Sequence, residues 1–180
     1  MRLYTGRGDD GTTDLLGARV GKDDPRVDVI GALDETTSAI GLGRALATTG
    51  DVREGLLTTQ RDLYRIMAEL AFTPEVRPAS YSLAADRVDW LGEATDRLAA
   101  QVELPRAFIV PGESVAGAAL DLARTVARRA ERQAVALAHA NGDVSPPILG
   151  YLNRLSSLLF AAARVEDAAA GGGIQLAKNR

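Results

Sequence analysis

The chain has 180 residues, of which 46% are hydrophobic and only 4% aromatic, with a formal net charge of −3 and no cysteine. This length and apolar share suit one folded domain and exclude a wholly disordered chain. Without cysteine there are no disulfides, thiolate metal sites or cysteine nucleophiles, and the small negative charge gives no basic field to attract nucleic acid or anionic lipid. No apolar run reaches membrane-spanning length and the first residues lack a signal-peptide pattern, so we expect a cytoplasmic protein without nucleic-acid or membrane partners.

The first 24 residues are rich in glycine, aspartate and threonine, as in YTGRGDDGTTDL from Tyr4 to Leu15. Glycine is entropically costly to order, so such a stretch usually exists because its backbone must approach something closely. Backbone N–H groups in turns, together with threonine hydroxyls, can cradle an anion. We therefore predict a phosphate-binding loop over residues 1–24, with a disordered N-terminus as the alternative. It is not a Walker loop, because GARVGKDD lacks Ser or Thr after Lys22.

Apolar residues recur at helical spacing in five segments separated by proline and glycine breaks. The expected helices cover about residues 25–47, 52–72, 83–101, 113–139 and 148–168. Asp23 or Asp24 is expected to cap the first helix. The segment LPRAFIVPGES is expected to be extended, and residues 169–180 to form a flexible tail. Short connections predict an all-α antiparallel bundle over residues 25–168, in a single domain spanning residues 1–180.

The fourth predicted helix carries an arginine-rich stretch, LDLARTVARRAERQAVAL. At about 100° per residue, one narrow stripe of this helix contains Asp121, Arg124, Arg128 and Arg132. Three like charges on one helical edge repel each other unless an anion meets them. The ordinary alternative is a solvated helix face.

Other polar residues offer partners or alternatives. Asp34 and Glu35 are candidate carboxylates inside the bundle, where a buried arginine needs such a partner or a phosphate. Asn153 in YLNRLSSLLF is either a buried hydrogen-bonding group or a solvated position, and composition favours the second. His139 is the only histidine and is expected at the surface. With one histidine and no cysteine, zinc catalysis is improbable and no protein metal site is predicted.

Five segments together resemble the PduO-type ATP:cob(I)alamin adenosyltransferases in order and spacing. These segments are YTGRGDDGTTDL, KDDPRVDVIGALDETTSAIG, FIVPGES, ARTVARRAER and YLNRLSSLLF, and the resemblance runs from about residue 3 to about residue 164. It implies a ferritin-like homotrimer of five-helix bundles with active sites at the subunit interfaces. It also implies that Co(I) of reduced cobalamin attacks the 5′ carbon of ATP, giving adenosylcobalamin and triphosphate. The nucleophile then belongs to the cobalamin, and the protein supplies positioning, charge neutralisation and exclusion of water.

The resemblance also implies roles for individual residues. The catalytic set would be Arg128, Arg124 and Asp34, with Arg124 pairing with Asp34 to hold the subunit interface in register. Phe108 would lie against the lower face of the corrin, whereas without the resemblance it reads as an ordinary core phenylalanine. Mg²⁺ would be held mainly by ATP, and the resemblance allows a cob(II)alamin reductase and an adenosylcobalamin-dependent enzyme as partners. The implied ATP-binding residues are Tyr4, Thr5, Gly6, Arg7, Gly8, Asp9, Gly11, Thr13, Lys22, Arg128, Glu131 and Asn153.

Four positions depart from the commonest family pattern. Gly6 stands where a lysine is usual, Asp121 replaces a histidine, Ser157 an aspartate and Glu113 a glycine. The change at Gly6 removes one expected phosphate contact, which Arg7 would replace. Two other functions therefore stay open: a module that binds ATP or corrinoid without turnover, and a structural bundle whose arginines pair with partner helices.

Overall fold

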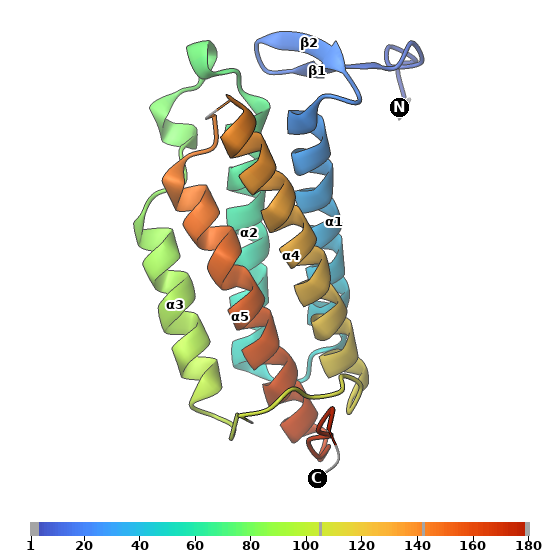
Figure 1. Ribbon diagram of the computed structural model, residues 1–180, viewed down its shortest axis with the longest axis vertical. Helices are drawn as coiled ribbons and strands as arrows, with labels where there is room; N and C mark the ends of the chain where they lie inside the picture. Colours follow the sequence, from blue (N-terminus) through green and yellow to red (C-terminus); the bar gives the residue numbers. More distant parts are fainter. Residues whose placement is uncertain (1–3, 105, 142, 179–180) are drawn as a thin grey trace.

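The computed structural model describes residues 4–104, 106–141 and 143–178. Five helices alternate in direction and lie side by side along one long axis (Figure 1), which confirms the predicted helical bundle. The helices are α1 (Pro25–Leu46), α2 (Gly50–Ala71), α3 (Asp86–Ala99), α4 (Val115–Asn141) and α5 (Pro146–Ala169). A hairpin of β1 (Thr12–Leu15) and β2 (Ala18–Gly21) precedes them, and two short 3₁₀ turns, η1 (Pro74–Val76) and η2 (Ala79–Tyr81), join α2 to α3. None of the helices in the described ranges is long and apolar enough to cross a membrane.

Capping and proline residues determine where α1 and α5 begin. Asp24 is its N-cap, and the Asp24 carboxylate accepts a hydrogen bond from the backbone N–H of Arg26 at 2.8 Å. Pro25 occupies the first turn, where its missing N–H costs nothing. Helix α5 likewise begins at a proline, Pro146.

The core lies where α4 packs against α1 and α5, and where α5 packs against α3. Helix α5 is buried on most of its faces, and α4 contributes a stripe of alanines that allows close approach. Burial of these aliphatic side chains supplies the main stabilisation of the bundle. Fully buried members include Leu33, Ile40, Leu120, Ala127, Ala130, Leu152, Leu155 and Leu159.

One buried polar cluster ties three helices together. Arg87 of α3 donates two hydrogen bonds to one oxygen and one to the other oxygen of the Asp62 carboxylate on α2, between 2.7 and 3.2 Å. The Tyr151 hydroxyl of α5 donates to the same carboxylate at 2.9 Å. Burial, and then the neighbouring Asp62 charge, raises the pKa of Tyr151, while the bonds to Asp62 raise the pKa of Arg87. The tyrosine therefore stays neutral in the fold.

The two terminal regions differ from the sequence-based expectation. Residues 1–24 were expected as a loop, yet Thr12–Leu15 and Ala18–Gly21 form an antiparallel hairpin. The backbone of Leu16 at its turn bonds to Ala71 and Thr73 at the end of α2. Residues 169–180 were expected as a flexible tail, but α5 extends to Ala169 and the described part of the tail pairs with the segment before α4. Both partners are distant in sequence, and local periodicity cannot show such pairing.

Candidate active site

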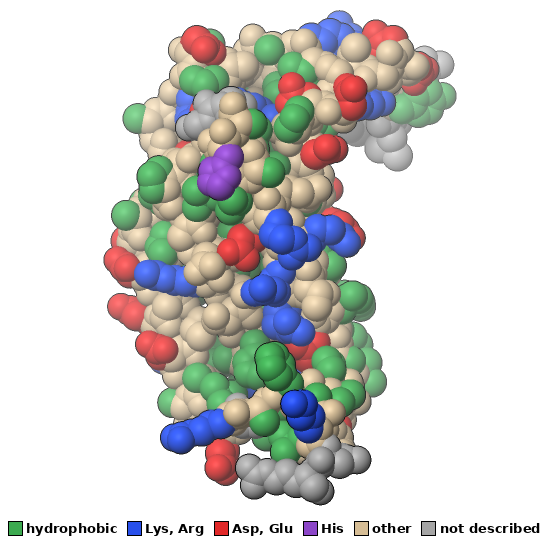
Figure 2. Space-filling model, in the orientation of Figure 1, with side chains coloured by type: hydrophobic (Ala, Val, Ile, Leu, Met, Phe, Trp, Pro, Cys, Tyr) green, Lys and Arg blue, Asp and Glu red, His purple; other side chains and the backbone are tan. Residues whose placement is uncertain are grey.

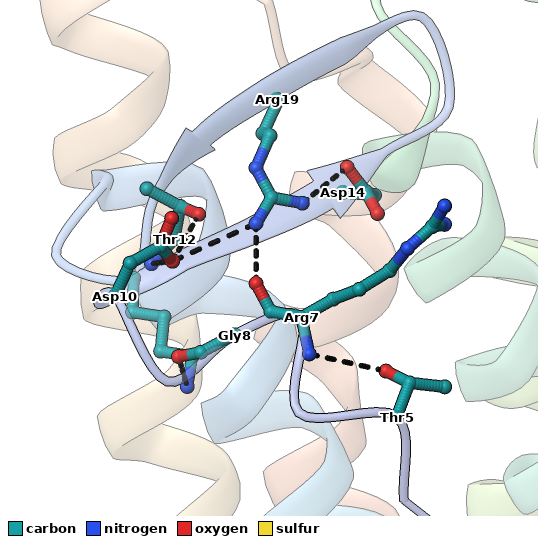
Figure 3. Close-up of polar contacts among 8 residues, drawn as sticks. Thr5, Arg7, Gly8, Asp10, Thr12, Asp14 and Arg19 are labelled. Carbon is teal, nitrogen blue, oxygen red and sulfur yellow. Dashed lines mark hydrogen bonds and ion pairs between the residues drawn. The ribbon is translucent and has the colours of Figure 1, made fainter.

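Part of the predicted phosphate loop lines a cavity of about 330 Å³, whereas Tyr4, Gly6, Asp9 and Gly11 do not line it. Lys22 donates from Nζ to the carbonyl of Gly8 at 2.8 Å, which closes the loop on itself. The N–H of Arg7 donates to Thr5 Oγ1 at 3.3 Å (Figure 3). The cavity is lined by five predicted residues, Thr5, Arg7, Gly8, Thr13 and Lys22, and by three others, Thr12, Asp14 and Arg19. The loop is thus an ordered, folded structure.

Two glycines explain why this stretch is glycine-rich. Gly11 has a φ of 81°, a left-handed conformation that L side chains rarely adopt. A Cβ at Gly8 would lie 3.0 Å from the Thr12 carbonyl oxygen and 3.1 Å from Lys22 Nζ, so a side chain there would crowd the closed loop. The left-handed backbone at Gly11 and the close contacts at Gly8 occur in the same turn, which explains why glycine recurs there.

Three cationic side chains, Arg7, Arg19 and Lys22, line the loop cavity together with one anionic side chain, Asp14. The Arg19 guanidinium donates to Asp14 at 2.8 Å and to the carbonyl of Arg7. Asp10 accepts from the Thr12 hydroxyl at 2.6 Å and the Thr12 N–H at 3.0 Å, and these bonds lower the pKa of the Asp10 carboxyl. The Arg7 guanidinium has no hydrogen bond or ion pair within the described chain, and Figure 3 shows it extended away from the dashed contacts. It is therefore a cation of the described part of the loop that is available to an anionic ligand.

The arginine-rich part of α4 forms a cationic surface over the middle of this helix (Figure 2). Arg128 is exposed, and its side chain makes no hydrogen bond or ion pair with the described residues. Arg132 instead donates to the carbonyl of Arg128 at 3.0 Å. Asn153 of α5 is exposed and donates to Glu131 at 2.9 Å, so two predicted ATP-binding residues meet directly beside this surface.

The carboxylates expected inside the bundle are not there. Asp34 and Glu35 are both exposed on α1, and Glu35 pairs with Arg129 of α4. Arg124 is partly buried and its Nε donates to Asp121 at 2.8 Å within the same helix. The position of Asp34 on the outer face of α1 follows from the helical register, which gives the inward face to Leu33 and Ile40.

Phe108 lies on the surface, not in the core. Phe108 is 90% exposed, which is the largest exposed fraction of any large hydrophobic residue in the described part of the chain. It lines a cavity of about 460 Å³, which also includes Asp121, Arg124 and Phe160. An aromatic ring held in water at the rim of a cavity beside an arginine is typical of a ligand-binding or partner-binding surface. We call this cavity the Phe108 pocket.

The β1–β2 hairpin and the first turns of α4 lie at opposite ends of the helical bundle (Figure 1). Lys22 directly precedes α1, whose Arg26 pairs with Asp143 just after the end of α4. The Phe108 pocket lies instead at the first turns of α4, beside Asp121 and Arg124. Seventeen residues of helix separate Arg124 from Asn141, about 25 Å at 1.5 Å per residue. One chain therefore does not bring the two sites together.

Comparisons with known proteins decide the family. The chain matches the family model of cobalamin adenosyltransferase over residues 3–166. The chain belongs to the cobalamin adenosyltransferase family. It is 40% identical to the corrinoid adenosyltransferase of Bacillus subtilis, covering 96% of this chain and 90% of that one. It is 41% identical to the corrinoid adenosyltransferase PduO of Salmonella typhimurium, but spans only half of that longer protein.

Solved structures of a related adenosyltransferase share the fold. A variant of the PduO-type ATP:corrinoid adenosyltransferase from Lactobacillus reuteri, complexed with cobalamin and ATP, superposes with a TM-score of 0.89 at 31% identity. The superposition covers 99% of this chain and all of that one. A second variant of the same enzyme, complexed with ATP, gives a TM-score of 0.88 at 32% identity.

Within this adenosyltransferase fold, sequence reasoning missed several residues in or near the two cavities. Arg19 and Asp14 line the loop cavity and face each other across the hairpin, and Asp10 lies 3.6 Å from Arg19. The sequence pattern gave no reason to distinguish Phe160 from the other apolar residues of α5, yet Phe160 lines the Phe108 pocket. Arg164 is buried and directly follows the apolar run LLFAAA of α5, and a charge after such a run was the signal that could have found it.

Proposed function

We propose that this protein transfers the 5′-deoxyadenosyl group of ATP to the Co(I) centre of reduced cobalamin, forming adenosylcobalamin and triphosphate. Membership of the cobalamin adenosyltransferase family supports the reaction class. The observation that carries the proposal is Phe108, an aromatic side chain 90% exposed at a cavity of about 460 Å³ that Arg124 also lines. A structural bundle has no need to hold a phenylalanine in water.

In the proposed reaction no residue of the protein forms or breaks a covalent bond. Co(I) supplies both electrons of the new Co–C bond, the bond between the 5′ carbon and oxygen breaks, and its electron pair leaves with triphosphate. The cobalt is thereby oxidised by two electrons to Co(III). The residues of this chain have to align the reactants, neutralise the charge that builds up on the leaving triphosphate and exclude water.

The proposed ATP site combines the opening loop with the α4 surface. Arg7 and Lys22 supply cations at the loop cavity, and Arg128 supplies an unpaired guanidinium on α4. Glu131 and Asn153, which already bond to each other, would complete the nucleotide pocket. The remaining proposed contacts come from the loop backbone and side chains: Tyr4, Thr5, Gly6, Gly8, Asp9, Gly11 and Thr13.

Mg²⁺ would enter with ATP, since no group of three or more acidic, histidine or cysteine side chains gathers as a metal site within the described ranges. Its role there would be to disperse the phosphate charge. A cytoplasmic location belongs to the same proposal and agrees with a chain that has no cysteine.

The proposed active unit is a homotrimer with sites between subunits. Its support is the separation within one chain of the phosphate loop and the Phe108 pocket, which a neighbouring subunit would bridge. Asp34 is exposed on α1, and the two terminal nitrogens of Arg124 have no partner within the described chain. Both groups are therefore available for the proposed pairing of Asp34 with Arg124 across an interface.

The direct test is anaerobic incubation with cob(I)alamin and Mg-ATP, following the corrinoid absorption spectrum. We expect conversion of the Co(I) spectrum to that of adenosylcobalamin, with release of triphosphate. Sedimentation velocity on the same sample is expected to give the mass of three chains. Binding of ATP and cobalamin without any product would contradict the proposed reaction and favour a binding module.

A further inference from the structure

Beneath the Phe108 pocket lies a buried ionic network formed by Asp121, Arg164 and Asp167. Asp121 and Arg164 are each only 4% exposed. The Arg164 guanidinium donates to Asp121 and lies 3.0 Å from Asp167, whose other oxygen accepts from the Ser114 hydroxyl at 2.7 Å. Buried ion pairs contribute little net stability, because desolvating both charges offsets their attraction. Stability alone therefore does not explain why this ionic network is buried next to the pocket.

Asp121 connects the network to the pocket. One Asp121 oxygen accepts from Arg164, and the other accepts from Arg124 Nε at 2.8 Å. Nε is the inner donor of a guanidinium, so this bond fixes the plane of the group while leaving both terminal nitrogens free to donate. Those nitrogens have no other hydrogen bond in the described chain, and Arg124 lines the pocket beside Phe108. The network thus fixes an arginine fork at the edge of the pocket, where the proposed interface would pair it with Asp34 of a neighbouring copy of the chain.

The charges of the network show why two carboxylates are present. Arg124 and Arg164 carry two positive charges, and Asp121 and Asp167 carry two negative ones. Asp167 balances Arg164 without touching Arg124, whereas Asp121 contacts both arginines. Asp121 is therefore the residue through which the rigid interior of α4 and α5 can hold the pocket arginine.

We propose that Asp121 is a positioning residue of the corrinoid site, acting through Arg124, with Arg164 as the buried anchor that holds Asp121 in place. This inference rests on the proposed function, which assigns the Phe108 pocket to the corrinoid. It adds to that function a residue at the wall of the pocket whose role is to orient Arg124.

The test compares Asp121→Asn with the matched control Asp167→Asn. Each variant removes one carboxylate charge from Arg164, so both should lower the melting temperature by similar amounts. Only Asp121→Asn removes the charged partner of Arg124, so it should raise the Kd for cob(II)alamin, measured by calorimetry, by roughly tenfold. The KM for ATP should change by less than about twofold, because the nucleotide contacts lie elsewhere. Asp121→Glu keeps the charge opposite Arg164 and the fold, yet displaces the carboxylate and should also weaken corrinoid binding.

A double-mutant cycle with Arg124→Lys identifies the route of the effect. Lysine keeps the charge but lacks Nε, so adding Asp121→Asn to it should cost no further corrinoid affinity. Additive losses, equal weakening by Asp167→Asn, or unchanged affinity in Asp121→Asn would each overturn the assignment. Failure of the proposed function would look different: wild-type protein would make no adenosylcobalamin, while the affinity ratio between variant and wild type would still decide the role of Asp121.

Discussion

Arg128→Ala separates catalysis from folding more cleanly than other changes in the α4 surface. The Arg128 side chain is exposed and makes no hydrogen bond or ion pair with the described residues. Removing it should therefore change the free energy of unfolding by no more than about 0.5 kcal/mol. If Arg128 instead donates to a phosphate of ATP, the lost interaction is a hydrogen bond between charged groups, worth about 1.5–3 kcal/mol. That range corresponds to a loss of roughly 10- to 100-fold in kcat/KM for ATP.

The matched control is Arg132→Ala, one turn further along the same helix. Arg132 carries the same charge and is also exposed, but its guanidinium is bonded to the carbonyl of Arg128. Both variants lower the net charge of the chain equally, so any difference between them reports position and not charge. The assay is the rate of adenosylcobalamin formation at varied ATP, with thermal unfolding on the same samples. Near-wild-type rates for Arg128→Ala, or equal losses in both variants, would refute the assignment of Arg128 to the nucleotide.

Three further predictions address the corrinoid, the interface and the buried polar cluster. Phe108→Ala should leave the melting temperature unchanged, because the ring is exposed in the free protein. The same variant should lower kcat/KM for cob(I)alamin by roughly 10- to 100-fold, which corresponds to the free energy of burying one phenylalanine side chain against a ligand. Full activity of Phe108→Ala would contradict its proposed role. Asp34→Ala should leave each bundle folded but raise the dissociation constant of the trimer at least roughly tenfold by unpairing Arg124, and an unchanged sedimentation profile would count against this pair. Tyr151→Phe should cost about 1 kcal/mol of stability by removing the bond to Asp62, visible as a lower melting temperature. The pKa of Tyr151 is raised in the folded protein, so above a pH of about 10 the unfolded chain loses the tyrosine proton while the folded protein keeps it. The free energy of unfolding of the wild type should therefore fall as the pH rises above that value. Denaturant titrations should show a weaker fall for Tyr151→Phe.

The helices could be predicted from the sequence because their signals are local. Apolar spacing placed the first helix at about 25–47, and the structure has it at Pro25–Leu46. The third helix begins later than expected, at Asp86 instead of about residue 83, because Leu83 lies in the connection before it, where its backbone N–H donates to the Glu69 carboxylate at 2.6 Å. Both the antiparallel arrangement and the single arginine-rich face of α4 follow from helix periodicity and short connections.

The site could be predicted only in part. The glycine-rich loop and the arginine stripe were visible as patterns, and the structure gives an ordered cavity to the first and an exposed surface to the second. The hairpin that assembles the loop was not visible, because polar strand residues such as Thr12 and Asp14 carry no apolar alternation. The exposure of Phe108 was also unpredictable, since FIVPGES reads equally well as a buried strand.

The sequence by itself determined which segments are helical, which helix is cationic and which family the chain resembles, because each of these depends on residues close together along the chain. Tertiary structure alone decided that Phe108 faces solvent, that Asp34 lies outside the bundle and that Asp121 pairs with a buried Arg164 of another helix. Burial and pairing depend on how distant helices pack, and the same residue can be core or surface according to the neighbours that packing gives it.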